Sequence, residues 1–169
     1  MESTTPGAER RDPVPDDPVR TDPGRPAGPG AGTDELTGLP DRSAIVRELT
    51  LGLARTSSGR PLTVIAVALG TLARVPSARR HVLHDDVVRD VALRLVSLLA
   101  DRGTVGRTAG DEFLVVLPDT DARAARRLTA EIDEVLHRPM RSDGLPVPLV
   151  AWQGATVVEA GGRTPVDVL

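Results

Sequence analysis

Two uninterrupted apolar runs constrain the fold of this chain more than any other feature. The segments LTVIAVAL (62–69) and FLVVLP (113–118) hold a single polar side chain between them, and β-branched residues are frequent in both. Such runs are typical of strands that are buried on both faces. We therefore expect a sheet with helices packed on it.

Three segments with apolar residues at helical spacing lie around these strands. The first follows the turn-rich sequence DELTGLPDR (34–42), where Asp41 is the expected N-cap, and extends to about Ser57. The second and third cover about 85–101 and 119–138. TVGR and EFLVVLP form an expected hairpin, and a last strand is expected within 145–158. This order predicts an α/β fold with a mixed sheet, in which helices join parallel strands as in polymerase-palm architectures.

Residues 1–33 differ in composition from the rest of the chain. They are rich in Pro, Gly, Asp and Arg and hold few apolar side chains, which predicts a disordered tail before a folded domain of residues 34–169. No stretch resembles a secretory signal or approaches the roughly 18 apolar residues of a membrane span. We expect a cytoplasmic protein without membrane contact.

Charge and residue usage exclude several kinds of chemistry. The chain has no cysteine, and all 21 of its basic residues are arginine, so thiol chemistry, a Walker-type phosphate lysine and a Schiff base are excluded. The formal net charge of −3 argues against nucleic acid as the main partner, because phosphate binding needs a basic surplus.

RTAGDEF (107–113) places two consecutive acids at the hairpin turn, and two further motifs precede it in a recognisable order. DELTGLPDR is similar to D-x-L-T-G-L-x-N-R, and HVLHDD (81–86) has His81 and Asp85 at the His and Asp of G-H-x-x-G-D. RTAGDEF is similar to R-x-G-G-D-E-F, with Ala109 at the first Gly. Together they resemble a GGDEF domain, the catalytic module of diguanylate cyclases. The resemblance covers 34–169 and implies a C-terminally truncated domain, since the family continues into a last helix.

The resemblance implies a reaction and a set of site residues. Diguanylate cyclases join two GTP molecules into cyclic di-GMP with the help of Mg²⁺ or Mn²⁺. It implies that Asp111 is a metal ligand and, with Glu112, catalytic, although neighbours on a strand point in opposite directions. The implied nucleotide-binding residues are Asp85, Arg107, Ala109 and Gly110.

The chain departs from the family pattern where the first strand ends. Ala68 and Gly70 stand at two positions where the family carries aspartate, and Pro76 stands at a guanine-reading asparagine. A hard cation needs several oxygen ligands, so Asp111 without these partners makes a poor metal site. Ala109 places a methyl group where glycine supplies positive φ or close approach to phosphate.

Two hypotheses for the function follow, and the enzyme question stays open between them. The first is a degenerate GGDEF-domain protein of bacterial cyclic di-GMP signalling that is catalytically impaired, needs no cofactor and acts by binding nucleotide or protein. The alternative is an active diguanylate cyclase that binds GTP as a homodimer, or as a heterodimer with another GGDEF protein whose half-site is complete. A decaying gene fragment is a third reading.

Several of these residues also have plain structural interpretations. Asp111 and Glu112 can be solvated turn residues, and Arg107 can form a structural ion pair with Asp34. His81, His84 and Asp85 have a spacing that also suits a transition metal. Trp152, the only tryptophan, is expected to fill the core.

Overall fold

The computed structural model describes residues 32–57, 59–70, 77–142, 145–147, 149–160 and 162–169. The predicted tail lies almost entirely outside the described residues, as does Pro76. The helices are α1 (Arg42–Arg55), α2 (Ser77–Leu99) and α3 (Ala122–Leu136), and a short 3₁₀ helix spans Pro165–Asp167. The strands are β1 (Leu62–Leu69), β2 (Thr104–Ala109), β3 (Glu112–Pro118), β4 (Met140–Ser142), β5 (Leu145–Val147) and β6 (Ala151–Val158).

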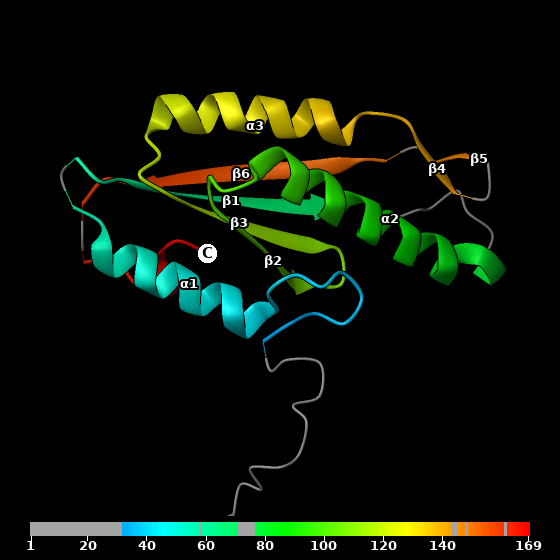
Figure 1. Ribbon diagram of the computed structural model, residues 1–169, viewed down its shortest axis with the longest axis horizontal. Helices are drawn as coiled ribbons and strands as arrows, with labels where there is room; N and C mark the ends of the chain where they lie inside the picture. The colour runs from blue at the N-terminus through cyan, green and yellow to red at the C-terminus, as the bar shows by residue number, and fades with distance from the viewer. Residues whose placement is uncertain (1–31, 58, 71–76, 143–144, 148, 161) are drawn as a thin grey trace, which may run out of the picture.

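The four long strands form one sheet in the order β2-β3-β1-β6 (Figure 1). The α/β class is confirmed. The expected mixed sheet is wrong in one respect for the described residues, because every neighbouring pair in this sheet is antiparallel. β1 and β2, which α2 connects, do run in the same direction. However, β3 lies between them and pairs with both.

Alternate side chains of β1 enter two different cores, so this strand is buried on both faces at its start. Ile65, Val67 and Leu69 pack with apolar residues of α2 and α3. Leu62 and Val64 pack with Ile45, Leu49 and Leu53 of α1 on the other face. The two-sided burial predicted from the apolar run is therefore confirmed, and its cause is that α1 covers one face while α2 and α3 cover the other (Figure 1).

α1 packs closely on β2 because this strand carries a glycine at the contact. A Cβ atom added to Gly106 would lie 2.5 Å from Cβ of Ile45 and 2.9 Å from the carbonyl oxygen of Pro40. Asp41 caps α1, as predicted, and accepts a hydrogen bond of 2.9 Å from the backbone N–H of Ala44. The cap and the glycine together fix where the helix begins and how near it lies to the sheet.

Two element boundaries differ from the prediction. α2 begins at Ser77, earlier than the expected start near Asp85. The single strand expected within 145–158 is divided into β5, which pairs with β4 in a separate small hairpin, and β6, which pairs with β1. The sequence of this segment, with prolines at positions 146 and 148, disfavours one continuous strand, since proline cannot donate to a ladder.

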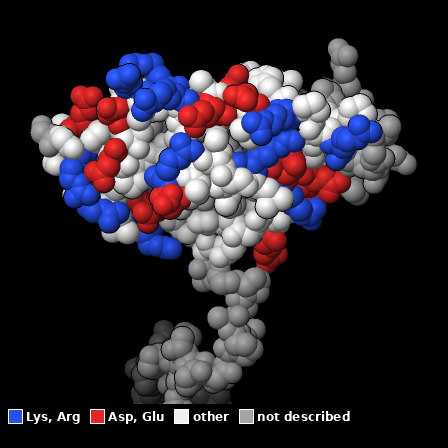
Figure 2. Space-filling view, turned by 45° about the horizontal axis from the view of Figure 1, so that its top comes forward, with Lys and Arg blue, Asp and Glu red and all other residues white. Residues whose placement is uncertain are grey.

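The outer surface agrees with a chain of mixed charge. Over the face seen in Figure 2, arginine side chains alternate with aspartate and glutamate, so this face has no continuous basic track. Among the helices of the described residues, none has the length and apolar character that a bilayer crossing requires.

Candidate functional site

The acidic motif lies at the turn between β2 and β3, as predicted. The pairing of these strands shifts between Arg107 and Ala109, which marks a bulge just before the turn. Within the described residues, positive φ at a non-glycine position occurs only at Ala100 and Asp119. Ala109 is therefore accommodated without left-handed backbone, so of the two roles considered for a glycine at this position, positive φ is not used in this chain.

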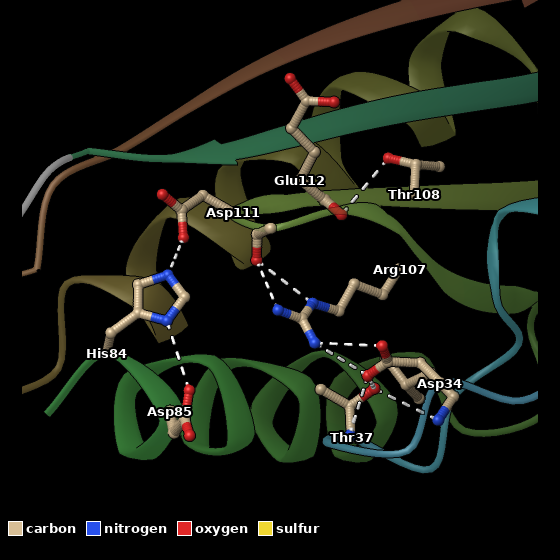
Figure 3. A network of polar contacts seen from close by, with 10 residues as sticks. Asp34, Thr37, His84, Asp85, Arg107, Thr108, Asp111 and Glu112 are labelled. Atoms are coloured by element: carbon tan, nitrogen blue, oxygen red, sulfur yellow. Dashed lines mark hydrogen bonds and ion pairs between the residues drawn. The ribbon is translucent and has the colours of Figure 1, made fainter. Parts of the chain in front are cut away.

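Arg107 holds the hairpin turn to the start of the domain. Its guanidinium donates to both carboxylate oxygens of Asp34 at 3.0 Å and to the carbonyl oxygen of Gly110 at 2.8 Å (Figure 3). The side chains of Arg107 and Asp34 are only 12% and 23% exposed. Arg107 thus makes two sets of contacts within the protein, to Asp34 and to Gly110. The structural ion pair with Asp34, which was one of the interpretations from the sequence, is present.

Asp34 is also fixed from its own turn. Its Oδ1 accepts hydrogen bonds from the Thr37 backbone N–H at 3.0 Å and from the Thr37 hydroxyl at 2.7 Å. Burial alone would raise the pKa of Asp34, but the hydrogen bonds from Thr37 and Arg107, together with the Arg107 charge, hold the pKa below its ordinary value. Asp34 is thus a charged anchor for the hairpin.

Asp111 points toward α2 and contacts a histidine. The Nε2 atom of His84 contacts Oδ1 of Asp111, while Nδ1 of His84 lies 3.5 Å from a carboxylate oxygen of Asp85 (Figure 3). His84 therefore sits between two residues to which the resemblance gives metal and nucleotide roles. From the sequence, His84 is expected only as a transition-metal ligand together with His81 and Asp85, and the side chain of His81 lies outside the described ones.

Glu112 lies on the opposite side of the hairpin from Asp111, as the alternation of a strand requires (Figure 3). It is the Cα partner of Ala68 on β1, and Ala68 is in turn the partner of Trp152 on β6. These residues line a cleft of about 450 Å³ on the part of the sheet face that α1 leaves open. The two consecutive acids thus serve different faces of the sheet.

Trp152 occupies space beside the position of a missing acid. A Cβ atom added to Gly70 would lie 3.1 Å from Cη2 of Trp152 and 3.2 Å from Cβ of Val150. The side chain of Trp152 is nevertheless on the surface, with 61% exposure, so the expectation that it fills the core is wrong. The reason is that its strand position faces the open cleft, where none of the described helices covers the sheet.

The described residues do not suit a divalent metal. Among them there is no group of three or more His, Asp or Glu side chains that could hold an ion, in agreement with the missing acids at Ala68 and Gly70. Asp111 contacts His84, whereas Glu112 points to the other side of the hairpin. The carboxylate oxygens of Asp111 and Glu112 therefore do not converge on one point. A cation of the Mg²⁺ type, which prefers octahedral oxygen ligands, is not served by this arrangement.

The fold corresponds to that of solved GGDEF domains. A sensory box/GGDEF family protein from Caulobacter crescentus CB15 is 30% identical, with a TM-score of 0.70, and the similarity covers 79% of this chain and 88% of that one. The family described as "Diguanylate cyclase, GGDEF domain" matches residues 31–169. The chain belongs to the GGDEF family.

Relatives with known names include enzymes that make and enzymes that degrade cyclic di-GMP. Diguanylate cyclase DgcP of Pseudomonas aeruginosa is 30% identical over 129 residues, which are 75% of this chain and 19% of that protein. Cyclic di-GMP phosphodiesterase PdeR of Escherichia coli K12 is 32% identical over 111 residues, which are 66% of this chain and 17% of that protein. The match therefore spans less than a fifth of the length of either relative, and it does not indicate which activity applies here.

Proposed function

We propose that this GGDEF domain acts in cyclic di-GMP signalling by binding a nucleotide or a protein and is impaired as a diguanylate cyclase. The observation that carries the proposal is the end of β1, where Ala68 and Gly70 replace two acids and Trp152 lies against Gly70. A two-metal transfer to phosphorus needs carboxylates from more than one strand to hold the ions. Among the described residues β1 carries no carboxylate, so the only strand acids at this place are those of the hairpin.

The state of Asp111 supports the same proposal. A carboxylate that ligates a metal must direct its oxygens to the ion, whereas one oxygen of Asp111 already contacts His84. An incoming cation would have to displace this contact and would still lack a second acid from β1. We infer that Asp111 is kept in a protein-bound position rather than in a ligating one.

A second function, an active cyclase, is favoured by one observation, the retention of both Asp111 and Glu112 at the hairpin. In that case Mg²⁺ or Mn²⁺ would be needed and a second GGDEF subunit would supply the rest of the site. Both functions are compatible with GTP binding and with a dimer, and neither requires nucleic acid or a membrane.

The experiment that separates the two functions is a product assay. Purified protein is incubated with GTP and Mg²⁺ and then with Mn²⁺, and cyclic di-GMP is measured by mass spectrometry, with an active GGDEF cyclase as positive control. We expect no product. Asp119→Asn, which removes an exposed acid remote from the hairpin turn, serves as a control for Asp111→Asn. Product that disappears only in Asp111→Asn would overturn the proposal.

The same assay tests the heterodimer directly. The protein is mixed with an active GGDEF cyclase at increasing ratio, and the rate of product formation per cyclase is recorded. A binding or inhibitory role predicts an unchanged or falling rate. A rise that requires Asp111 would instead show that this chain contributes a half-site.

A further inference from the structure

The two edges of the four-stranded sheet differ in how they are covered. At the β2 edge, the backbone N–H of Arg107 donates to the carbonyl oxygen of Pro40 at 2.9 Å, and a bulge follows Arg107. At the opposite edge, β6 pairs with β1, and within the described part of the chain no strand or bridge pairs with its other side. One row of backbone N–H and C=O groups of β6 is therefore left for pairing with another chain.

β6 lacks the features that usually protect an edge strand. Its sequence AWQGATVV (151–158) contains no charged residue and no proline, and its pairing with β1 continues through the strand without a bulge. Gly154, Ala155 and Thr156 are all exposed, although consecutive residues face opposite sides of the sheet. Sheets blunt their open edges with charges, proline or bulges, so an unprotected edge of this kind is an interaction surface.

The strand is self-complementary when a second copy pairs with it antiparallel about Gly154. Opposite residues in such a pair must point to the same face of the sheet, so the two-fold axis passes through a residue. With the axis at Gly154, Trp152 lies opposite Thr156 of the second copy, and Gln153 lies opposite Ala155. Pairs of an aromatic and a β-branched side chain stabilise neighbouring strands, and no like charges meet in this register.

α3 carries a charge distribution that fits the same two-fold axis. Exposed arginines lie in its first half and exposed acids in its second half: Arg123, Arg126 and Arg127, then Glu131, Asp133 and Glu134. This order is the reverse of the one that the helix dipole favours, so helix stability does not explain it. α3 lies beside β6, and the Gln153 amide donates to the carbonyl oxygen of Thr129 at 3.0 Å (Figure 1). In a copy rotated by 180°, α3 runs in the opposite direction, so the basic half of each helix lies beside the acidic half of the other.

We propose that the domain forms a homodimer in which the β6 strands of two copies pair antiparallel about Gly154 and join the two sheets into one. The two-fold axis closes the assembly at two copies, and the covered β2 edges do not extend it. Trp152 and the hairpin residue Glu112 lie at the same end of the sheet, so antiparallel pairing places the two hairpin turns at opposite ends of the joined sheet. This dimer therefore differs from one in which two bound GTP molecules meet, and the inference does not depend on catalysis.

Single cysteines report the pairing register, because the natural chain contains no cysteine. With the axis at Gly154, the Cα atoms of residue 154 in the two copies lie about 5 Å apart, within reach of a disulfide, whereas those of residue 156 lie roughly 14 Å apart. We expect Gly154→Cys to form a disulfide-linked dimer under mild oxidation at least about tenfold faster than Thr156→Cys. Equal rates would indicate random collision and would overturn the inference.

Sedimentation equilibrium measures the dimer of the natural protein. We expect a Kd of roughly 1–100 μM, because one strand pair with a flanking helix gives a small interface. Gly154→Lys should raise the Kd by at least about tenfold, since two like charges then face each other, while an added Cβ meets no atom within 4 Å in the single chain. Ala54→Lys is the matched control, because it adds the same charge to the exposed surface of α1 and should leave the Kd unchanged. A natural protein that stays monomeric at about 1 mM would overturn the inference and leave the edge to a strand of a different protein.

A charge exchange tests the contact between the two α3 helices. Arg126 and Asp133 are seven residues apart and lie on one flank of α3, and the Gln153 amide contacts the Asp133 carboxylate at 3.5 Å. Arg126→Glu should raise the Kd by about fivefold or more, because it places acid beside acid across the two-fold axis. The double variant Arg126→Glu with Asp133→Arg should restore the affinity, with circular dichroism as the check on folding. A double variant as weak as the single one would show that the proposed arrangement is wrong.

Discussion

The ring of Trp152 lies against Gly70, so that a Cβ atom at position 70 would come within 3.1 Å of Cη2 and the ring would have to shift by a few tenths of an ångström. We expect Gly70→Asp to lower the free energy of unfolding by about 1–3 kcal/mol through overpacking, as measured by urea denaturation. In the Trp152→Ala background the same change should cost at least about 0.5 kcal/mol less, because the obstacle is gone. Equal costs in both backgrounds would show that the contact is unimportant.

Metal binding is expected to be absent from the natural chain and recoverable at one position. Mn²⁺ should leave the melting temperature of the natural protein unchanged. Ala68→Asp places a carboxylate opposite Glu112, and Mn²⁺ at a hundredfold excess over its Kd would then stabilise the variant by about 2.7 kcal/mol. Ala66→Asp is the matched control, since Leu114 lies opposite it. Stabilisation of the natural protein would instead reveal ligands beyond those described.

The ion pair between Asp34 and Arg107 is expected to make stability depend on acid. The pKa of Asp34 is lowered in the folded protein, so the pair contributes above the ordinary pKa of about 4, and the contribution is lost as the pH falls through the lowered pKa. Asp34→Asn should cost about 1–3 kcal/mol at pH 7, and the difference should shrink in acid. Urea denaturation of the natural protein and of Asp34→Asn at pH 7 and at pH 3 measures the cost at neutral pH and its decrease in acid.

The matched control for Asp34→Asn is Asp119→Asn. Asp119 pairs with Arg60 at 3.0 Å, but both side chains are more than half exposed, with 61% for Arg60 and 56% for Asp119. Asparagine also tolerates the positive φ of this position, 52°. This variant should change stability little at either pH. A cost as large as that of Asp34→Asn would indicate a general charge effect and not an anchor.

Gly106 lies in β2 beneath α1, and we expect it to tolerate substitution poorly. A methyl group at this position would overlap Ile45 and approach the carbonyl oxygen of Pro40, so Gly106→Ala should cost about 1–3 kcal/mol. Gly154→Ala adds the same methyl group where no atom lies within 4 Å and should be close to neutral. Comparable losses in the two variants would contradict the packing of α1 on β2.

The sequence predicts the elements of this fold better than their pairing. The apolar run 62–69 coincides with β1, and Asp41 caps α1, because burial period and capping are local properties of the chain. The position of β3 between β1 and β2 is a property of the whole sheet, so the prediction of a mixed sheet fails although the strands that α2 joins do run in the same direction. The β4–β5 hairpin has too few residues to produce a periodic pattern.

The candidate site shows the same division. The opposite directions of Asp111 and Glu112 follow from strand alternation alone, and the Asp34–Arg107 pair was considered from the motifs. The contact between His84 and Asp111 joins residues 27 positions apart and depends on how α2 crosses the hairpin, which no local pattern encodes. The exposure of Trp152 depends on how far α1 extends over that sheet face, because the described helices leave this part of it open.

The ion pair between Asp34 and Arg107 also has a consequence for the order in which the domain folds. The two residues are 73 positions apart in the sequence. The guanidinium of Arg107 is oriented by its hydrogen bond to Gly110 in the hairpin turn, so the ion pair cannot form before the hairpin does. Contacts between distant positions form late when chain closure limits the rate. The turn around Asp34 is synthesised before the hairpin. It is nevertheless expected to reach its final position late in folding, after the hairpin has left the ribosome.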